Sequence, residues 1–265
     1  MQNILVPIGT SENAHETLQY AVDFATEFDS NVYVMEVFSV SASASSLANI
    51  REKLDELTKE HIKGVIEKVD ARNINIKIAT YNGDIVDGLK DIDRDLGIDL
   101  IILAPRSNDI QEEYYLGNTS GKIVKQTDIP TLIVPKGTVF KPFKTILTAF
   151  KSGVLKQKSI LNPLIEVKEK FDSKVSLLFV KTPGYTKEDL KINMSLMGLS
   201  SELTQSENPS TYLGVLQHFE AKHPDLLCVF RRKRGFFKKL WERNTILKSE
   251  FYAPVPVLVL SVKKD

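Results

Sequence analysis

Short runs of apolar, often β-branched residues alternate along this chain with longer stretches in which apolar residues recur at helical spacing. Residues 31–38 are a run of the first kind, and Leu54, Leu57 and Ile62 follow the second pattern. The first pattern is typical of buried strands and the second of amphipathic helices. Their alternation predicts an α/β fold, in which right-handed helical crossovers join parallel strands and cover both faces of a sheet.

The same alternation is expected in both halves of the chain. In the first half it predicts strands at 3–8, 31–38, 74–80, 98–104 and 130–135, and helices at about 12–28, 46–70, 84–95 and 118–127. In the second half it predicts strands at 145–149, 174–181, 200–205, 225–230 and 255–262, and helices at about 156–171, 185–196, 209–222 and 244–252.

The two halves also resemble each other residue by residue. Asp29–Phe38 matches Asp172–Lys181 at an offset of 143, and Ile129–Val134 matches Val255–Leu260 at an offset of 126. The fall in the offset indicates that the second copy has lost 17 residues, which we place in one helix. We therefore predict a tandem repeat, with one domain at 1–138, a linker around Gly137 and Pro142, and a second domain at 143–265, whose second helix region is shortened.

Composition indicates a globular protein but does not indicate its function. Hydrophobic residues make up 42% and charged residues 26%, which is typical of a globular chain. The formal net charge is +1, so we expect no general attraction to nucleic acid or to membranes. The start MQNILVPIGTS lacks the basic region of a secretory signal, no apolar segment is long enough to span a membrane, and Cys228 is the single cysteine. A cytoplasmic location is expected.

Motifs at both ends of the first copy resemble the universal stress protein family (UspA-like). The opening Asn3–Pro7, then Ser11 and Tyr20–Ala21, is similar to the family's first strand and helix. Asp99–Leu103, Leu116–Gly117 and Ile129–Pro135 are similar to its fourth strand, phosphate loop and last strand. The resemblance covers nearly the whole chain in two copies. It implies two doubly wound five-stranded parallel sheets in the order 3-2-1-4-5, an adenine nucleotide alpha hydrolase-like fold, with a ligand crevice between strands one and four.

The resemblance also implies a nucleotide site, which this sequence matches poorly. In family members that bind ATP, an Asp after the first strand contacts the adenosine, and a G-x-x-G loop, nine residues and Gly-Ser or Gly-Thr surround the phosphates. Carried over, the candidate positions are Pro7, Gly9 in place of the Asp, Ala104 and Ser107 in place of two loop glycines, Gly117, Asn118, Thr119 and Ser120. We expect a degenerate site, with an anion site at 117–120 and ATP or AMP possible in the first copy only. Asn118 is alternatively a helix N-cap.

A basic run in the second copy suggests a different kind of contact. Residues 231–239 hold six cations, and Phe236, Phe237 and Trp241 are interleaved with them or follow closely. One interpretation is a loop that docks an acidic partner or a phospholipid surface. The other is a solvated loop whose aromatic residues pack against the fold. The candidate partner-binding residues are Arg231, Arg232, Lys233 and Arg234.

Catalytic and metal-binding signatures are missing from the sequence. His218 and His223 are five residues apart, whereas helical metal ligands are three or four apart, and no nucleophile elbow, P-loop or dinucleotide fingerprint occurs. Cys228 lies in an apolar run and is expected to be buried and inert. We expect no catalytic residue, no metal and no enzymatic activity beyond very slow ATP hydrolysis.

The last strand of each copy is apolar at consecutive positions and is expected to be a sheet edge. Similar proteins dimerise through this strand, so the sequence predicts that 130–135 and 255–262 pair within the chain, with further homodimerisation possible. Three hypotheses follow: a non-catalytic regulatory or binding module of the stress response, a nucleotide sensor that uses the first copy, and an adaptor that docks through the basic loop.

Overall fold

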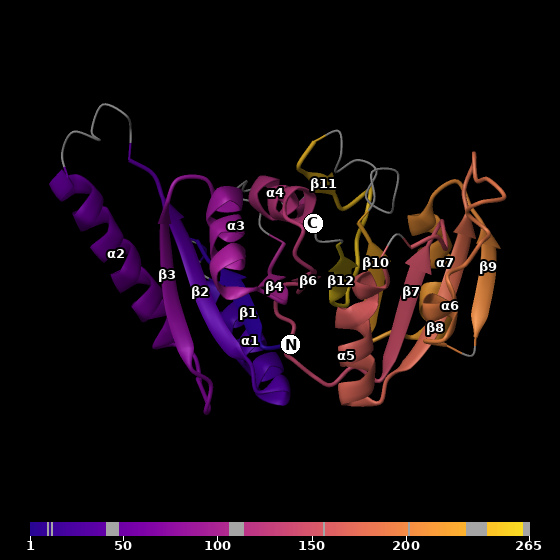
Figure 1. Cartoon of the computed structure of the whole chain (residues 1–265), viewed down its shortest axis with the longest axis horizontal. Helices are drawn as coiled ribbons and strands as arrows, with labels where there is room; N and C mark the ends of the chain where they lie inside the picture. The colour runs from indigo at the N-terminus through magenta and orange to yellow at the C-terminus, as the bar shows by residue number, and fades with distance from the viewer. Residues whose placement is uncertain are drawn as a thin grey trace. The chain divides into compact units, whose positions relative to one another are not determined.

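The computed structural model describes residues 1–9, 11, 13–40, 48–105, 114–155, 157–200, 202–231 and 243–261. They form an α/β fold divided into two compact units (Figure 1). One unit consists of Met1–Ala104 and Lys136–Phe140, and the other of Pro105–Pro135 and Lys141–Asp265. The units do not coincide with the two copies of the repeat, because residues 105–135 of the first copy group with the second.

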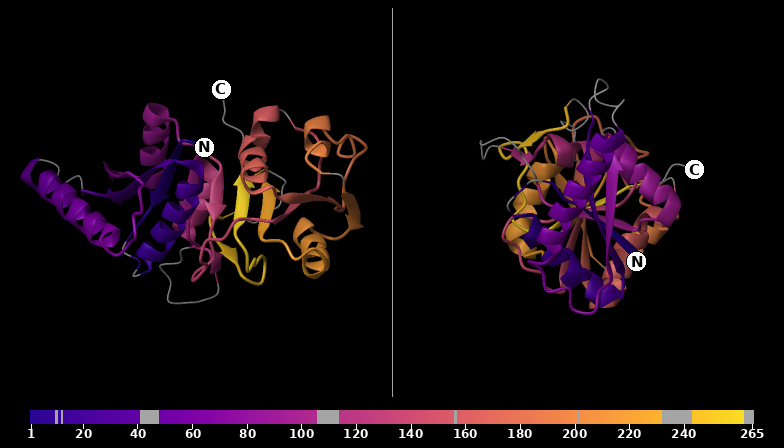
Figure 2. Two further views of the ribbon diagram at one scale, coloured as in Figure 1. Left: turned by 90° about the horizontal axis from the view of Figure 1, so that it is seen from below. Right: turned by 90° about the vertical axis from the view of Figure 1, so that its left-hand side faces the viewer.

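The first unit is a parallel sheet between helices. Its strands are hydrogen bonded in the order β3-β2-β1-β4. Helices α1 and α2 lie on one face of this sheet and α3 on the other (Figures 1 and 2). The elements are β1 (Asn3–Pro7), α1 (Ala14–Phe28), β2 (Asn31–Phe38), α2 (Ala48–Ile66), β3 (Ile76–Asn82), α3 (Ile85–Leu96) and β4 (Leu100–Leu103).

The second unit contains a six-stranded sheet in the order β6-β12-β10-β7-β8-β9. Its last five strands reproduce the predicted 3-2-1-4-5 order of the second copy. Helix α7 covers the face opposite α5 and α6 (Figures 1 and 2). The elements are β5 (Tyr114–Leu116), α4 (Asn118–Gln126), β6 (Thr131–Ile133), β7 (Thr145–Phe150), η1 (Lys158–Leu161), α5 (Asn162–Phe171), β8 (Lys174–Lys181), α6 (Met194–Met197), β9 (Leu203–Glu207), α7 (Thr211–Lys222), β10 (Leu226–Phe230), β11 (Ile246–Leu247) and β12 (Val257–Leu260).

The copies are joined through their last strands, as the edge pattern predicts. β6 of the first copy pairs antiparallel with β12 of the second, with Thr131 opposite Val259 and Ile133 opposite Val257. The expectation of two separate parallel sheets is wrong on this point. The sheet of the second copy continues into the first and is mixed, because pairing satisfies the backbone groups that two exposed apolar edges would leave open.

The repeat is visible in individual hydrogen bonds. The Asp99 carboxylate accepts from two consecutive backbone N–H groups at the start of β1, at 2.6 and 3.1 Å. The Asp225 carboxylate accepts from the corresponding pair at the start of β7, at 3.0 and 3.0 Å. In both copies, therefore, a carboxylate that precedes the fourth strand fixes the first strand beside it.

A second pair of equivalent residues fixes the helix that precedes the second strand. Asp29 and Asp172 end α1 and α5 in the left-handed conformation, with φ of 52° and 51°. The hydroxyl of Ser30 then donates to the Met1 carbonyl at 2.9 Å, and that of Ser173 to the Phe143 carbonyl at 2.6 Å. The Asp-Ser dipeptide thus has the same structural role twice.

Two predicted helices of the second copy differ in the structure. The helix expected at 185–196 is reduced to α6, since residues 184–193 form turns that contact the loop after β7. The helix expected at 244–252 is instead β11 followed by a turn, because Ile246 and Leu247 pair with β5. Tertiary pairing overrides local helical spacing at both places.

Candidate functional site

The predicted nucleotide-site residues of the first unit lie at the carboxyl ends of β1 and β4. β1 and β4 are parallel neighbours, and Pro7 is the last residue of β1. The N–H of Ile8 donates to the Met35 carbonyl at 2.8 Å, which extends the pairing with β2 by one residue. Half-buried Gly9 follows this residue, and half-buried Ala104 follows β4. Pro7, Gly9 and Ala104 therefore lie at the ends of neighbouring strands.

The remaining described candidates lie at the start of α4, in the second unit. Gly117 is the N-cap, with φ −72° and ψ 174°, and makes no side-chain capping hydrogen bond. Asn118 is the first residue of the helix, so the alternative of Asn118 as N-cap is wrong. Asn118 is exposed, Thr119 half-buried and Ser120 buried. The first turn of α4 thus carries the amide groups and the positive end of the helix dipole, and its N-cap residue contributes no side-chain cap.

The predicted nucleotide site is divided between the two compact units. Pro7, Gly9 and Ala104 belong to one unit and Gly117 to Ser120 to the other. Ser107 lies outside the described residues. A single site formed by all of these residues therefore stays a prediction.

The chain just before α4 is bound to the second copy. β5 pairs antiparallel with β11, with Leu116 opposite Ile246 and Tyr114 opposite Leu247. The sequence analysis predicts no strand in this segment, and no signal in its residues predicts a partner so distant in the chain.

Tyr115 anchors this two-stranded ribbon. Its ring packs edge-on against Phe251, with centroids 4.5 Å apart, and contacts Tyr252 at 6.4 Å. Burial, reinforced by Tyr212 and Tyr252, raises the pKa of Tyr115 above its ordinary value. Its hydroxyl is buried and has no hydrogen-bond partner among the described residues. Packing by the ring, without the hydroxyl, holds Tyr115 in place.

In the second copy, the end of the first strand is covered by the chain itself. The N–H of Gly153 donates to the Asp189 carbonyl at 3.0 Å, and the N–H of Asn193 donates back to the Gly153 carbonyl at 2.9 Å. A Cβ on Gly153 would lie 2.5 Å from the Cα of Ile192. The segment 186–193 therefore lies against the loop after β7 at Gly153, which corresponds to the loop after β1.

Asp189 fixes this segment through its carboxylate. The group accepts from the N–H and hydroxyl of Thr186 at 2.9 and 3.0 Å. Burial acts to raise the pKa of Asp189, but hydrogen bonds from Thr186 and Ser152 outweigh it, so the pKa is lowered. Asp189 is thus ionised at neutral pH and its carboxylate is hydrogen bonded within the chain.

The basic run is described only at its first residue. The guanidinium of Arg231 donates to the Lys125 carbonyl at 2.7 Å and forms an ion pair with Asp128. The Arg231 side chain is 13% exposed, so any partner would have to compete with these contacts. Arg232, Lys233 and Arg234 lie outside the described residues, and their role in partner binding stays a prediction.

The other described side chains that could take part in chemistry are in contact with the fold or buried within it. The His61 ring contacts Glu36 at 2.6 Å, and the His218 ring lies 2.8 Å from the Gly214 carbonyl. Cys228 is fully buried in β10, and burial raises the pKa of its thiol above its ordinary value. Within the ranges described above, no three His, Cys, Asp or Glu residues are grouped to hold a metal. No helix there has the length and apolar character needed to cross a membrane.

Comparisons with known proteins agree with this architecture. The family model described as "Universal stress protein family" matches residues 1–135. Universal stress protein MJ0531 of Methanocaldococcus jannaschii is 25% identical over 140 residues, which cover 51% of this chain and 82% of the relative.

Two solved structures extend the similarity of fold to both copies. A universal stress protein from Archaeoglobus fulgidus matches with a TM-score of 0.70 and 18% identity, covering 99% of this chain and 97% of that one. A putative universal stress protein from Pseudomonas aeruginosa matches with a TM-score of 0.59 and 14% identity, covering 98% and 93%. These structures share the tandem fold along nearly the whole chain.

Proposed function

Because this chain belongs to the universal stress protein family, we propose that it is a non-catalytic regulatory or binding module of the stress response, with a degenerate nucleotide site. The observation that carries the proposal is the ribbon formed by β5 and β11. In family members that bind ATP, the segment before the fourth helix belongs to the loop around the phosphates. Here its Tyr115 is buried against Phe251 of the second copy.

The residues at the first strand support the same proposal. Gly9 provides no carboxylate where ATP-binding members have an Asp, and Ala104 carries a Cβ where they have glycine. A Cβ prevents the close approach of backbone N–H groups to a phosphate. Both changes disfavour close wrapping of a nucleotide.

The second copy supports the proposal by a different route. The segment 186–193 lies against the loop after β7 and is held there by backbone hydrogen bonds to Gly153. A ligand at this position would have to displace the segment and break those bonds. We infer that the second copy serves as a fixed structural partner of the first.

One observation favours a nucleotide sensor as a second candidate. Helix α4 begins at Asn118, and its N-cap Gly117 makes no side-chain capping hydrogen bond. The amide groups of such a helix end attract an anion. A nucleotide could be held there through its phosphates alone. This function would use the first copy only.

Thermal unfolding with and without magnesium ATP or AMP separates the two candidates. A regulatory module with a degenerate site shows no shift. A sensor gains stability by mass action, about 2.7 kcal/mol at a hundredfold excess of nucleotide over its Kd. A saturable shift of the unaltered chain would therefore overturn the first proposal and support the second.

Restoring the family's residues tests the reason for the degeneracy. The triple variant Gly9→Asp, Ala104→Gly, Ser107→Gly is expected to acquire a nucleotide-dependent shift, because it regains the carboxylate and the glycines. Gly9→Asp alone is the matched control, since it leaves the loop unchanged. If the triple variant and the control respond alike, the glycine positions do not explain the difference.

A further inference from the structure

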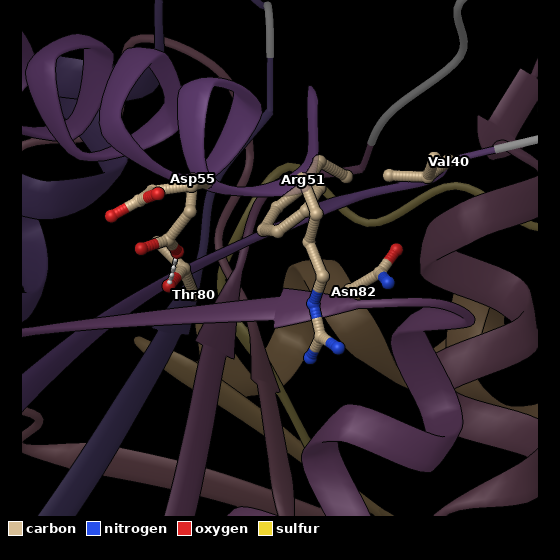
Figure 3. Close-up of a pocket in the computed structure, with 7 residues that line it drawn as sticks. Val40, Arg51, Asp55, Thr80 and Asn82 are labelled. Atoms are coloured by element: carbon tan, nitrogen blue, oxygen red, sulfur yellow. Dashed lines mark hydrogen bonds between the residues drawn. The ribbon is translucent and has the colours of Figure 1, made fainter. Parts of the chain in front are cut away.

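A pocket lies between α2 and the carboxyl ends of β2 and β3, within the first unit. Its volume is about 550 Å³, within the range of small-molecule sites. Its described lining combines an apolar part with charged and amide groups (Figure 3): Phe38, Val40, Arg51, Glu52, Asp55, Thr80 and Asn82. None of these residues belongs to the predicted nucleotide site.

The pocket lies where the sheet-facing residues of α2 change from apolar to polar. Ile62 and Val65, toward the end of the helix, are 0% and 6% exposed. About two and three turns earlier, Asp55 and Arg51 take positions on the same helix face as Ile62. They line the pocket beside the strand β3, at the edge of this unit's sheet.

One carboxylate of the pocket is already engaged within the protein. Asp55 accepts a hydrogen bond from the Thr80 hydroxyl and forms an ion pair with Lys59 at 2.6 Å. The hydrogen bonds from Lys59 and then Thr80 lower the pKa of Asp55. Asp55 is thus ionised and balanced by Lys59. Among the described residues, Arg51 is then the cation of the pocket lining that has no close anionic partner.

Three polar side chains of the lining are not engaged by other described residues. Arg51, Glu52 and Asn82 have no side-chain hydrogen bond or ion pair to another described residue; Arg51 acts on Asp55 only at longer range. Figure 3 shows the Arg51 side chain extending from α2 toward the part of the pocket where Asn82 lies, apart from the hydrogen-bonded Asp55 and Thr80. The pocket therefore offers a guanidinium, a carboxylate and a carboxamide beside an apolar surface.

These groups favour a ligand that carries one positive and one negative charge. A guanidinium binds a carboxylate in two parallel hydrogen bonds, and a carboxylate binds an ammonium group. A ligand with several negative charges would be repelled by Glu52 and Asp55. A ligand with one charge of each sign satisfies Arg51 and Glu52 together.

We propose that this pocket binds a small zwitterion, a free α-amino acid with an apolar side chain. Its carboxylate contacts Arg51, its ammonium group contacts Glu52, and its side chain packs on Phe38 and Val40. Asn82 supplies a further hydrogen bond to the carboxylate. The site is separate from the ends of β1 and β4, so it does not depend on whether the chain binds a nucleotide.

Calorimetric titration of the full chain with leucine and two of its analogues tests the proposal. Isocaproate retains the carboxylate without the amine, and isoamylamine retains the amine without the carboxylate. Leucine is expected to bind saturably, and each analogue about tenfold or more weakly, because each leaves one charged group of the site unpaired.

Two variants test which side chain binds the carboxylate of the ligand and which binds its ammonium group. Arg51→Gln is expected to bind leucine and isoamylamine alike, and Glu52→Gln to bind leucine and isocaproate alike. A change in the ratio of leucine binding to analogue binding reports on the pocket itself, because a general loss of stability would weaken all three ligands together. Arg94→Gln and Glu188→Gln, at exposed positions elsewhere, are the matched controls and should behave as the unaltered chain.

Three results would overturn the proposal. The first is the absence of saturable leucine binding by the unaltered chain. The second is unchanged discrimination in both pocket variants. The third is equal binding of leucine and isocaproate by the unaltered chain, which would indicate a site for simple carboxylates without a role for Glu52.

Discussion

At the scale of single residues, Gly153 shows how closely the second copy is packed at the end of β7. A Cβ there would lie 2.5 Å from the Ile192 Cα and 2.7 Å from its Cγ1. Backbone cannot move aside as a flexible side chain can. Gly153→Ala should therefore destabilise the chain by about 1–3 kcal/mol, measured by urea unfolding.

Gly64 provides the opposite case and the matched control. It lies inside α2, and a Cβ added to it would meet no atom within 4 Å. Gly64→Ala should stabilise the chain by about 0.5–1 kcal/mol, because alanine loses less backbone entropy in a helix. If both alanine variants change stability in the same direction, the contact with Ile192 is not the cause.

Asp225 links stability to pH. Burial acts to raise its pKa, but hydrogen bonds from Lys141 and from two backbone N–H groups lower it below 3.8. A carboxylate whose pKa is lower in the folded state stabilises the fold above its unfolded pKa, and this contribution is lost as the pH falls through the folded value.

Asp225→Asn should therefore cost about 1–3 kcal/mol of unfolding free energy at neutral pH. The difference between variant and unaltered chain should shrink as the pH falls below about 4. Urea unfolding at neutral and acid pH measures both values. Asp95→Asn, at a side chain that is 70% exposed, is the control; a constant difference for Asp225→Asn across this range would contradict the linkage.

At the scale of elements, the ribbon of β5 and β11 depends on the ring of Tyr115 and not on its hydroxyl. The hydroxyl is buried and has no partner among the described residues. Tyr115→Phe should leave stability unchanged or slightly raise it, because it removes an unsatisfied polar group. Tyr115→Ala should cost about 3–5 kcal/mol through loss of the ring. A clear loss of stability on Tyr115→Phe would show that the hydroxyl has a bonding role.

The strands that the sequence predicts well are those with a long apolar run. Residues 31–38 and 174–181 are both found as strands with the predicted bounds. The Asp29-Ser30 and Asp172-Ser173 pairs, which carry the repeat in the sequence, also have matching backbone and hydrogen bonds. Local pattern and tertiary structure agree in these segments.

The short elements could not be predicted, for a physical reason. β5 and β11 have three and two residues, too few for a period to appear. Their pairing joins positions far apart in sequence, and the helical spacing of 244–252 predicts the wrong structure. The pocket beside α2 could not be predicted either, since its lining residues come from separate segments of the chain and form no motif.

At the scale of the whole molecule, the register between β6 and β12 can be tested by crosslinking. Thr131 lies opposite Val259, and opposite residues of antiparallel strands have Cβ atoms about 4.5–5.5 Å apart. Thr131→Cys with Val259→Cys should therefore form an intramolecular disulfide under mild oxidation. Gel mobility with and without reductant, combined with mass spectrometry of the linked peptides, measures it.

The pair Thr131→Cys and Val257→Cys is the matched control. Val257 lies opposite Ile133, and diagonal neighbours are about 7–8 Å apart, too far for a disulfide without backbone movement. The native Cys228, in the neighbouring strand β10, lies opposite Leu258. Its side chain therefore points to the other face of the sheet from those of residues 257 and 259, and it should not interfere. Equal crosslinking of both pairs, or linkage only between separate molecules, would contradict the register.

The antiparallel contact of β6 and β12 within one chain also changes which substitutions each strand can accept. In a dimer of identical subunits, a substitution in the contact strand occurs on both sides of the symmetry axis, so every residue must tolerate its own copy. Fusion removes this requirement. Thr131 now meets Val259 at one place only, and each strand is free to specialise toward a partner that differs from itself.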